Sequence, residues 1–283
     1  MGRKRSVIGQ PPLSSAPLAP WSHRIGWLHM PKSGTSFGTS LAHLANASLP
    51  SDAAIGVHTS LDPAMHSSQG IDIILRYPYD QWFRGTFWTK RHTNFADHDA
   101  LWDGSGWSPN YVGRIFSMFR EPSSRARSAY NHFGHSCHSN FSSFEAQMRG
   151  TAVTMVTGQR TYGLTCIACG SNCKPLIPDV KRAVDRLDTF AFVGLVEEWA
   201  LSICLLHTMH GATFHSESCN AAEFGNSRKA SYKKTSKEDI FALSANDPAD
   251  EALYAAAKRR FWSDVQWYSV TAASCRQRNC TID

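Results

Sequence analysis

The chain has 283 residues, of which 42% are hydrophobic and 18% charged, and its net charge is +6 with thirteen histidines counted as neutral. This composition excludes a disordered or fibrous protein and indicates a globular chain with a substantial core. The basic excess favours anionic ligands, but the chain has no lysine-rich helix or aromatic-basic repeat, so nucleic-acid binding is not expected.

The N-terminal segment, residues 1–22, has no apolar run typical of a signal peptide, and we expect a disordered leader ahead of a single domain at 23–283. The start MGRKRS fits the myristoylation pattern at Gly2, but the match is short and a solvated tail start is favoured over it. No apolar run has the length of a membrane span, so membrane association is expected only through lipidation or an anchor missing from the chain.

Short apolar runs predict buried strands at 24–30, 71–77, 113–119 and 190–196. Helical spacing of apolar residues follows several of these runs. The predicted helices cover 35–47, a segment starting at Pro122, 177–187, 197–210 and two segments within 236–267, the second beginning at Asp250. Strands that alternate with helices predict an α/β fold with a mostly parallel sheet covered on both faces.

Eight cysteines form an even set, with Cys166, Cys169 and Cys173 close together and Cys275 and Cys280 forming a second group. Zinc sites usually take two separated CxxC-type pairs, and only one is present here. Disulfides in an oxidising compartment are therefore favoured over zinc, with the connectivity left open. Three Asn-x-Ser/Thr sequons are compatible with secretion, at Asn46, Asn140 and Asn279.

The stretch HMPKSGTSFG links the first predicted strand to the first predicted helix. Unpaired N–H groups and the positive dipole end make a helix N-terminus an anion site. Gly34 allows close backbone approach, Lys32 supplies a positive charge, and Thr35 and Ser36 supply hydroxyls. An ATP or GTP loop ends in Gly-Lys-Ser/Thr, whereas here the lysine precedes the glycine and the turn is shorter. A smaller anionic group is expected, without a requirement for Mg²⁺.

The second segment with candidate functional residues is FREPSSRARSAYNH, which begins at the end of the strand predicted at 113–119. Arg120 leaves that strand at its carboxyl end, and Ser128 lies two helical turns further on, facing the same side. Ligands of open parallel sheets bind beyond the carboxyl ends of the strands, so Lys32 and Arg120 are expected to meet there. Arg127 is expected on a solvated helix face.

The motif PKSGTS after one strand and FREPxxRxxSxYxH after a later one together resemble the two signature segments of sulfotransferases that use 3′-phosphoadenosine 5′-phosphosulfate (PAPS). The segment FVGLVEEWALSICLL, and the basic stretch NSRKASYKK ahead of the last long helix, resemble segments of the Golgi carbohydrate branch. The resemblance covers roughly residues 24–265.

This resemblance implies a three-layer P-loop-type α/β fold, with a central, mostly parallel sheet flanked by helices. It implies that Lys32, Ser33, Gly34, Thr35 and Ser36 wrap the 5′-phosphosulfate of PAPS. Further cofactor contacts would come from Arg120 and Ser128 at the 3′-phosphate and from Arg228 and Lys229 in a loop that closes over the nucleotide.

The implied reaction is in-line transfer of a sulfuryl group to an acceptor hydroxyl, with a carbohydrate or other glycan as the expected partner and no metal required. Lys32 would stabilise the charge that builds on the leaving oxygen. A histidine suits the general base because its pKa lies near neutrality, and His92 occupies the matching region. His58 is the second candidate, ahead of the group Asp97 to Asp99.

Two residues depart from the family pattern: Glu121 replaces the usual Asp, and Ser36 replaces a common Thr. Relatives of this branch carry a membrane anchor that is not visible here, so the Golgi lumen is expected with the cytoplasm as the alternative. Two other functions stay open. One is a nucleotide kinase-like phosphotransferase, and the other is a non-catalytic glycan-binding module stabilised by disulfides or zinc.

Overall fold

The computed structural model describes residues 26–28, 30, 32–34, 37, 115–132, 140–157, 177–210, 219, 246–278 and 280. The predicted leader at 1–22 and the strand predicted at 71–77 lie outside these residues, as does most of the helix predicted at 35–47. The prediction of a single domain at 23–283 remains a prediction.

Three parallel strands form the sheet in the order β1, β2, β3: β1 (Gly26–Leu28), β2 (Ile115–Phe119) and β3 (Phe192–Leu195). Gly26 is paired with Ile115, and Phe116 with Phe192. Every residue of β2 and β3 is buried, as expected where β-branched and aromatic residues fill strands of a parallel sheet. The strands predicted at 24–30, 113–119 and 190–196 are confirmed.

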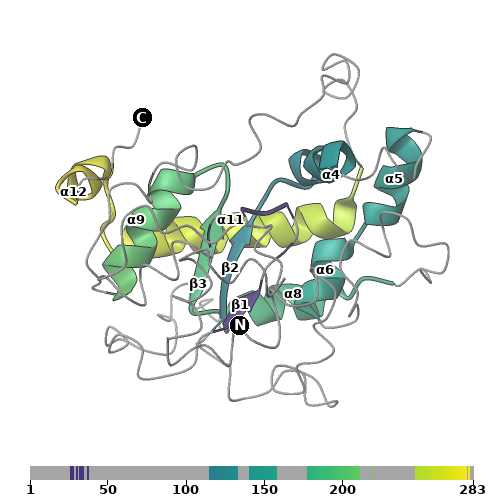
Figure 1. The fold of residues 1–283 in the computed structure, drawn as a ribbon. Coiled ribbons are helices and arrows are strands. Elements are labelled where there is room, and N and C mark those ends of the chain that lie inside the picture. Colours follow the sequence, from purple (N-terminus) through teal and green to yellow (C-terminus); the bar gives the residue numbers. More distant parts are fainter. Residues whose placement is uncertain are drawn as a thin grey trace, which may run out of the picture.

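Seven helices are described between and after these strands: α4 (Pro122–His132), α5 (Phe141–Met148), α6 (Thr151–Val156), α8 (Val180–Leu187), α9 (Trp199–His210), α11 (Pro248–Trp267) and α12 (Ala272–Arg276). The fold is therefore mixed α/β with a small parallel sheet (Figure 1). The helices predicted from Pro122, at 177–187, at 197–210 and from Asp250 are confirmed as α4, α8, α9 and α11.

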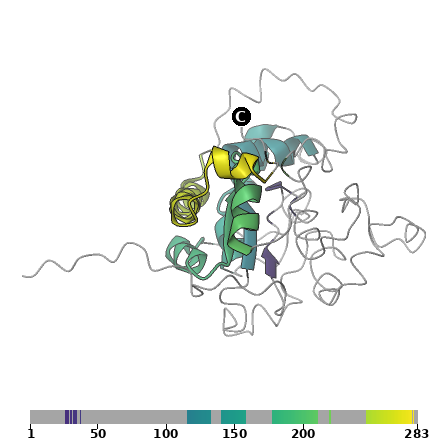
Figure 2. The same cartoon turned by 90° about the vertical axis from the view of Figure 1, so that its left-hand side faces the viewer.

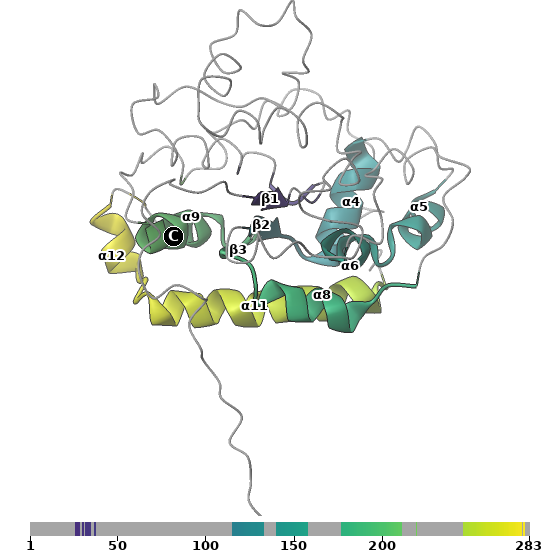
Figure 3. The same ribbon diagram turned by 90° about the horizontal axis from the view of Figure 1, so that it is seen from below.

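The long helix α11 packs against β3, α6 and α8. Figures 2 and 3 show α11 on the β3 side of the sheet, with β1 on the opposite side. At one end of the molecule α12 lies beside α9, and α4 and α5 lie at the other end (Figures 1 and 3).

Aromatic side chains join the strands to the flanking segments. The Phe37 ring stacks on Phe192 with 5.5 Å between centroids, and Phe192 stacks on Phe116 at 6.2 Å. The Phe116 ring in turn lies 5.1 Å from His210 at the end of α9. Burial lowers the pKa of His210 to about 4, so this imidazole is neutral at physiological pH.

Three short helices, α5, α6 and α12, were not predicted from the sequence. Side-chain caps start α5 and α12, whereas α6 begins at Gly150 without a side-chain cap. The Asn140 side chain accepts a hydrogen bond from Ser143 N at the start of α5. Thr271 and Ser274 form a capping box at the start of α12.

Candidate anion-binding site

The chain turns sharply after β1. Ser33 N donates a hydrogen bond to Met30 O at 3.0 Å, which closes a four-residue turn whose third residue, Lys32, has φ 66°. A positive φ at this position is typical of a type II turn, and proline is common at the preceding position, where the sequence has Pro31. Lys32 adopts this conformation without the freedom of a glycine, which is uncommon and strained.

Gly34 follows with φ 76°. A Cβ atom at this position would lie 2.8 Å from Trp199 Cζ3 and 3.4 Å from Val196 Cγ2. The glycine is therefore required both by the backbone conformation and by the close approach of α9. Phe37 N donates a hydrogen bond to Gly34 O at 3.0 Å, and Phe37 is helical.

Arg120 connects this turn to the end of β2. Its Nη1 donates a hydrogen bond to Lys32 O at 3.2 Å. Because β1 and β2 are adjacent and parallel, their carboxyl ends meet at the same edge of the sheet. The structure thus brings together the Lys32 turn and Arg120, which are 88 residues apart in the sequence.

The backbone next to Arg120 is held by two carboxylates. Glu121 accepts hydrogen bonds from Ser123 N at 2.9 Å and Ser124 N at 2.6 Å, so it caps the start of α4. Although burial acts to raise the pKa of Glu121, these hydrogen bonds lower it below its ordinary value. Glu121 thus caps helix α4. The sulfotransferase motif that this segment resembles usually has Asp at this position.

Glu197, just after β3, supplies the second carboxylate. Its Oε1 accepts from Glu121 N at 3.0 Å, and its Oε2 accepts from the Tyr254 hydroxyl at 2.9 Å. Burial and then the hydrogen bond to Glu197 raise the pKa of Tyr254, so the phenol stays protonated. Glu197 therefore connects the ends of β2 and β3 to helix α11.

Arg125, one turn into α4, is buried with 2% of its surface exposed. Its Nη2 forms an ion pair with Asp250 Oδ2 at 2.5 Å, and Asp250 is 1% exposed. Asp250 also accepts from Ala152 N at 3.0 Å and Val153 N at 2.9 Å at the start of α6. This network joins α4, α6 and α11 behind the edge where Arg120 lies.

Arg127 was expected on a solvated helix face, and the structure corrects this. Its side chain is 22% exposed and its Nη2 donates to Ser124 Oγ at 3.1 Å. Glu121 Oε2 lies 3.9 Å from the same nitrogen. The guanidinium therefore folds back onto the first turn of its own helix.

A small hollow lies between the Lys32 turn and α11. Its lining includes Ser33, Arg120, Arg125, Asp250 and Tyr254, and it has room for about one water molecule. Among the residues that the structure describes, neither Ser33 Oγ nor Arg125 Nη1 finds a hydrogen-bond partner, although both atoms are buried. The hollow is too small for a nucleotide.

Ser128, predicted to share the 3′-phosphate with Arg120, lies on α4 and is half-buried. It does not line the hollow. Its role at the nucleotide remains a prediction. Several other predicted site residues lie outside the described residues: Thr35, Ser36, His58, His92, Asp97, His98, Asp99, Arg228 and Lys229.

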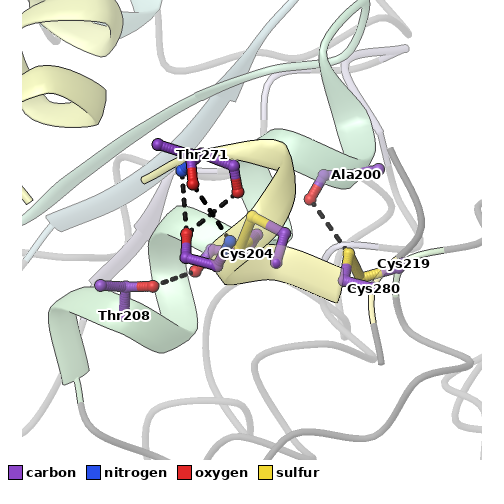
Figure 4. The surroundings of a disulfide bond; sticks show 8 residues. Ala200, Cys204, Thr208, Cys219, Thr271 and Cys280 are labelled. Carbon is purple, nitrogen blue, oxygen red and sulfur yellow. Dashed lines mark hydrogen bonds between the residues drawn. A yellow bond between two sulfur atoms is a disulfide. The ribbon is translucent and has the colours of Figure 1, made fainter. Parts of the chain in front are cut away.

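Two disulfides tie the C-terminal segment to α9 and the chain that follows it (Figure 4). Cys204 in α9 is bonded to Cys275 in α12, and Cys219 is bonded to Cys280. The disulfide prediction holds for these four cysteines. The alternative zinc ligands Cys166, Cys169 and Cys173 lie outside the described residues.

Within the described ranges, no group of three His, Cys, Asp or Glu side chains could hold a metal ion. In the same part of the chain, no helix combines the length and apolar character needed to cross a membrane.

Three residues of this site were missed in the sequence: Arg125 as a buried ion, Asp250 as its partner, and Glu197. Glu197 had a usable signal because it directly follows a predicted parallel strand, at the edge where ligands bind. Asp250 had none, because its partner is 125 residues away.

Comparison of the chain with models of known protein families, with curated proteins and with solved structures finds no match. The functional assignment therefore depends on the residues and their geometry.

Proposed function

We propose that the protein is a PAPS-dependent sulfotransferase that acts on a hydroxyl group of a carbohydrate or other glycan, within a three-layer P-loop-type fold. The observation that carries this proposal is the hydrogen bond from Arg120 to the Lys32 carbonyl. It joins the two segments that resemble the cofactor motifs at the carboxyl edge of a parallel sheet.

The residues of the edge fit an anionic nucleotide. The Lys32 ammonium and the N-terminus of the helix that the sequence predicts at 35–47 would supply positive potential for one anionic group. Arg120, with Ser128 on the helix that follows, supplies donors for a second.

PAPS, when bound, would supply the activated sulfuryl group. In this proposal Lys32 stabilises the negative charge on the leaving oxygen, and His92 takes the proton from the acceptor hydroxyl. Thr35 and Ser36 donate to the same phosphosulfate, and Arg228 and Lys229 close over the nucleotide. The Golgi lumen is the proposed location, in keeping with the disulfides of the C-terminal segment.

Calorimetry with adenosine 3′,5′-bisphosphate, the product nucleotide, tests the binding site. We expect the wild-type protein to bind it without added metal. The variants Lys32→Ala and Arg120→Ala each remove a charged donor and should weaken binding about 10- to 100-fold. The matched controls Lys181→Ala and Arg259→Ala remove exposed cations of α8 and α11 and should bind as the wild type does.

The absence of nucleotide binding by the wild-type protein, or equal binding by all four variants, would contradict the proposal. Tight binding of ATP with Mg²⁺ that excludes the bisphosphate would favour the phosphotransferase alternative. Stoichiometric zinc in the purified protein, without nucleotide binding, would favour the non-catalytic module.

Transfer from labelled PAPS to a panel of glycans tests the reaction itself. Lys32→Ala is expected to lower the transfer rate by about 10²–10³, the usual cost of one preorganised donor. His92→Ala should abolish the pH-dependent part of the rate, while His58→Ala should retain it.

A further inference from the structure

Two residues line the same hollow behind the Lys32 turn, and each has a buried polar atom without a partner among the described residues. Ser33 is 2% exposed and Arg125 is 2% exposed, and both line the hollow. Within the described part of the chain, Ser33 Oγ and Arg125 Nη1 are each without a hydrogen-bond partner. A buried polar group without a partner is costly, so such atoms are usually satisfied by an ordered water molecule.

We propose that Arg125 is a positioning residue, which holds the Lys32 turn in place by sharing one buried water molecule with the Ser33 hydroxyl. The inference rests on the proposed function for its effect on nucleotide binding, but the water bridge itself does not depend on that function.

The size and charge of the hollow both favour water over a bound anion. There is room for about one water molecule. The positive charge of Arg125 is already balanced by Asp250, which is paired with its other terminal nitrogen, Nη2. The Asp250 carboxylate also lines the hollow and would repel an anion placed there.

Asp250 at the start of α11 connects that helix, through Arg125, to the Lys32 turn. Asp250 fixes Arg125 through Nη2 and is itself fixed by the amides of Ala152 and Val153. Asp250 thus engages Nη2 of Arg125, while Nη1 is buried without a protein partner in the ranges that the structure describes and can bind the water. Ser33 is adjacent to Lys32, so a displaced Ser33 side chain would also shift the backbone carbonyl that Arg120 binds.

A double-mutant cycle between Ser33 and Arg125 tests the shared water. Ser33→Ala removes the hydroxyl, and Arg125→Lys keeps a cation for Asp250 while removing the second nitrogen. Each single variant should weaken adenosine 3′,5′-bisphosphate binding about 3- to 10-fold, the usual cost of one hydrogen bond. The double variant should be no weaker than the weaker single variant, because both changes remove the same bridge.

The same cycle, measured by urea unfolding, requires no ligand. Here the shift in the unfolding midpoint of the double variant should be smaller than the sum of the two single shifts. The pair Ser33→Ala and Arg127→Lys is the matched control and should be additive, because Arg127 contacts Ser124 and Glu121 instead.

The two proposals fail in different ways. If the wild-type protein does not bind the nucleotide but unfolding shows coupling, the proposed function fails and the bridge stands. Additive unfolding shifts would overturn the bridge whatever the protein binds. A crystal structure that shows a nucleotide oxygen in the hollow, or a direct protein contact to Arg125 Nη1, would also overturn it.

Discussion

At the scale of single residues, the feature that stands out is the backbone of the turn after β1. Lys32 and Gly34 both have positive φ, and only one of them is a glycine. A non-glycine residue in the left-handed region costs about 1 kcal/mol or more. Strain of this kind is typical of functional positions, and here it falls on the residue that the proposed mechanism needs most.

This strain yields a prediction that separates stability from function. Lys32→Gly should give a free energy of unfolding about 1 kcal/mol higher than Lys32→Ala, because only glycine adopts this φ without cost. Both variants should lose nucleotide affinity equally, since both lack the ammonium group. Urea unfolding and calorimetry measure the two effects. Equal stability of the two variants would show that the turn is not strained at Lys32.

At the scale of secondary-structure elements, the N-terminus of α11 combines structural and electrostatic roles. Asp247 is the N-cap and accepts from Asp250 N at 3.0 Å and from Gly150 N at 3.0 Å. Burial, and then the nearby Asp250 carboxylate, raise the pKa of Asp247 to about 6. One helix end thus holds two buried carboxylates, with Arg125 paired to only one of them.

The raised pKa predicts a pH dependence of stability. In the unfolded chain the carboxyl group titrates near its ordinary value of 3.8, and in the folded protein at about 6. The protonated Asp247 carboxyl group therefore adds to the stability of the fold. This stabilisation is fully present below the pKa of the unfolded chain and is lost as the pH rises through about 6.

Asp247→Asn removes this titration while retaining a capping oxygen. Between pH 4 and pH 7 the stability of the variant should improve relative to wild type by on the order of 2 kcal/mol. Urea unfolding at several pH values measures the difference. Glu251→Gln, which removes an exposed carboxylate from the same helical turn, is the control. A difference that does not change with pH would show that Asp247 is not protonated in the folded protein near pH 5.

At the scale of the whole molecule, long-range links fasten the C-terminal segment, from α11 to Cys280, to the rest of the fold. The disulfides fasten the segment after α11 to α9 and to Cys219, at the end of the molecule opposite α4 and α5 (Figures 1 and 3). The buried ion pair of Arg125 and Asp250 fastens the other end of α11 to α4. The segment from α11 to Cys280 is thus fastened near its start by the ion pair and near its end by the disulfides.

The paired substitution Cys204→Ala and Cys275→Ala should lower the free energy of unfolding by about 2–4 kcal/mol, because it frees a long loop in the unfolded chain. These cysteines are 71 residues apart. Nucleotide affinity should not change, because Cys204 lies more than a helical turn beyond Trp199, the α9 residue against which Gly34 packs. Urea midpoints and calorimetry test both parts. A large loss of affinity would mean that the disulfide also supports the site.

Most of the strands and helices that the structure describes could be predicted from patterns within short stretches of the sequence. Apolar runs identified β1, β2 and β3, and helical spacing identified α4, α8, α9 and α11, because each signal lies within a few turns of the chain. The helices α5, α6 and α12 were missed because they are short, and their apolar residues do not form a clear stripe. Caps such as Thr271 with Ser274 determine where such helices form.

The sequence by itself determined the parallel α/β character of the chain and the placing of Lys32 and Arg120 at strand ends, because both follow from local order. Tertiary structure alone decided which distant residues meet: Arg125 with Asp250, Glu197 with Tyr254, and each cysteine with its partner. The physical reason is that hydrogen bonds, ion pairs and disulfides depend on separation in space. A charge or a thiol has no local pattern that specifies which residue, far along the chain, folding will bring beside it.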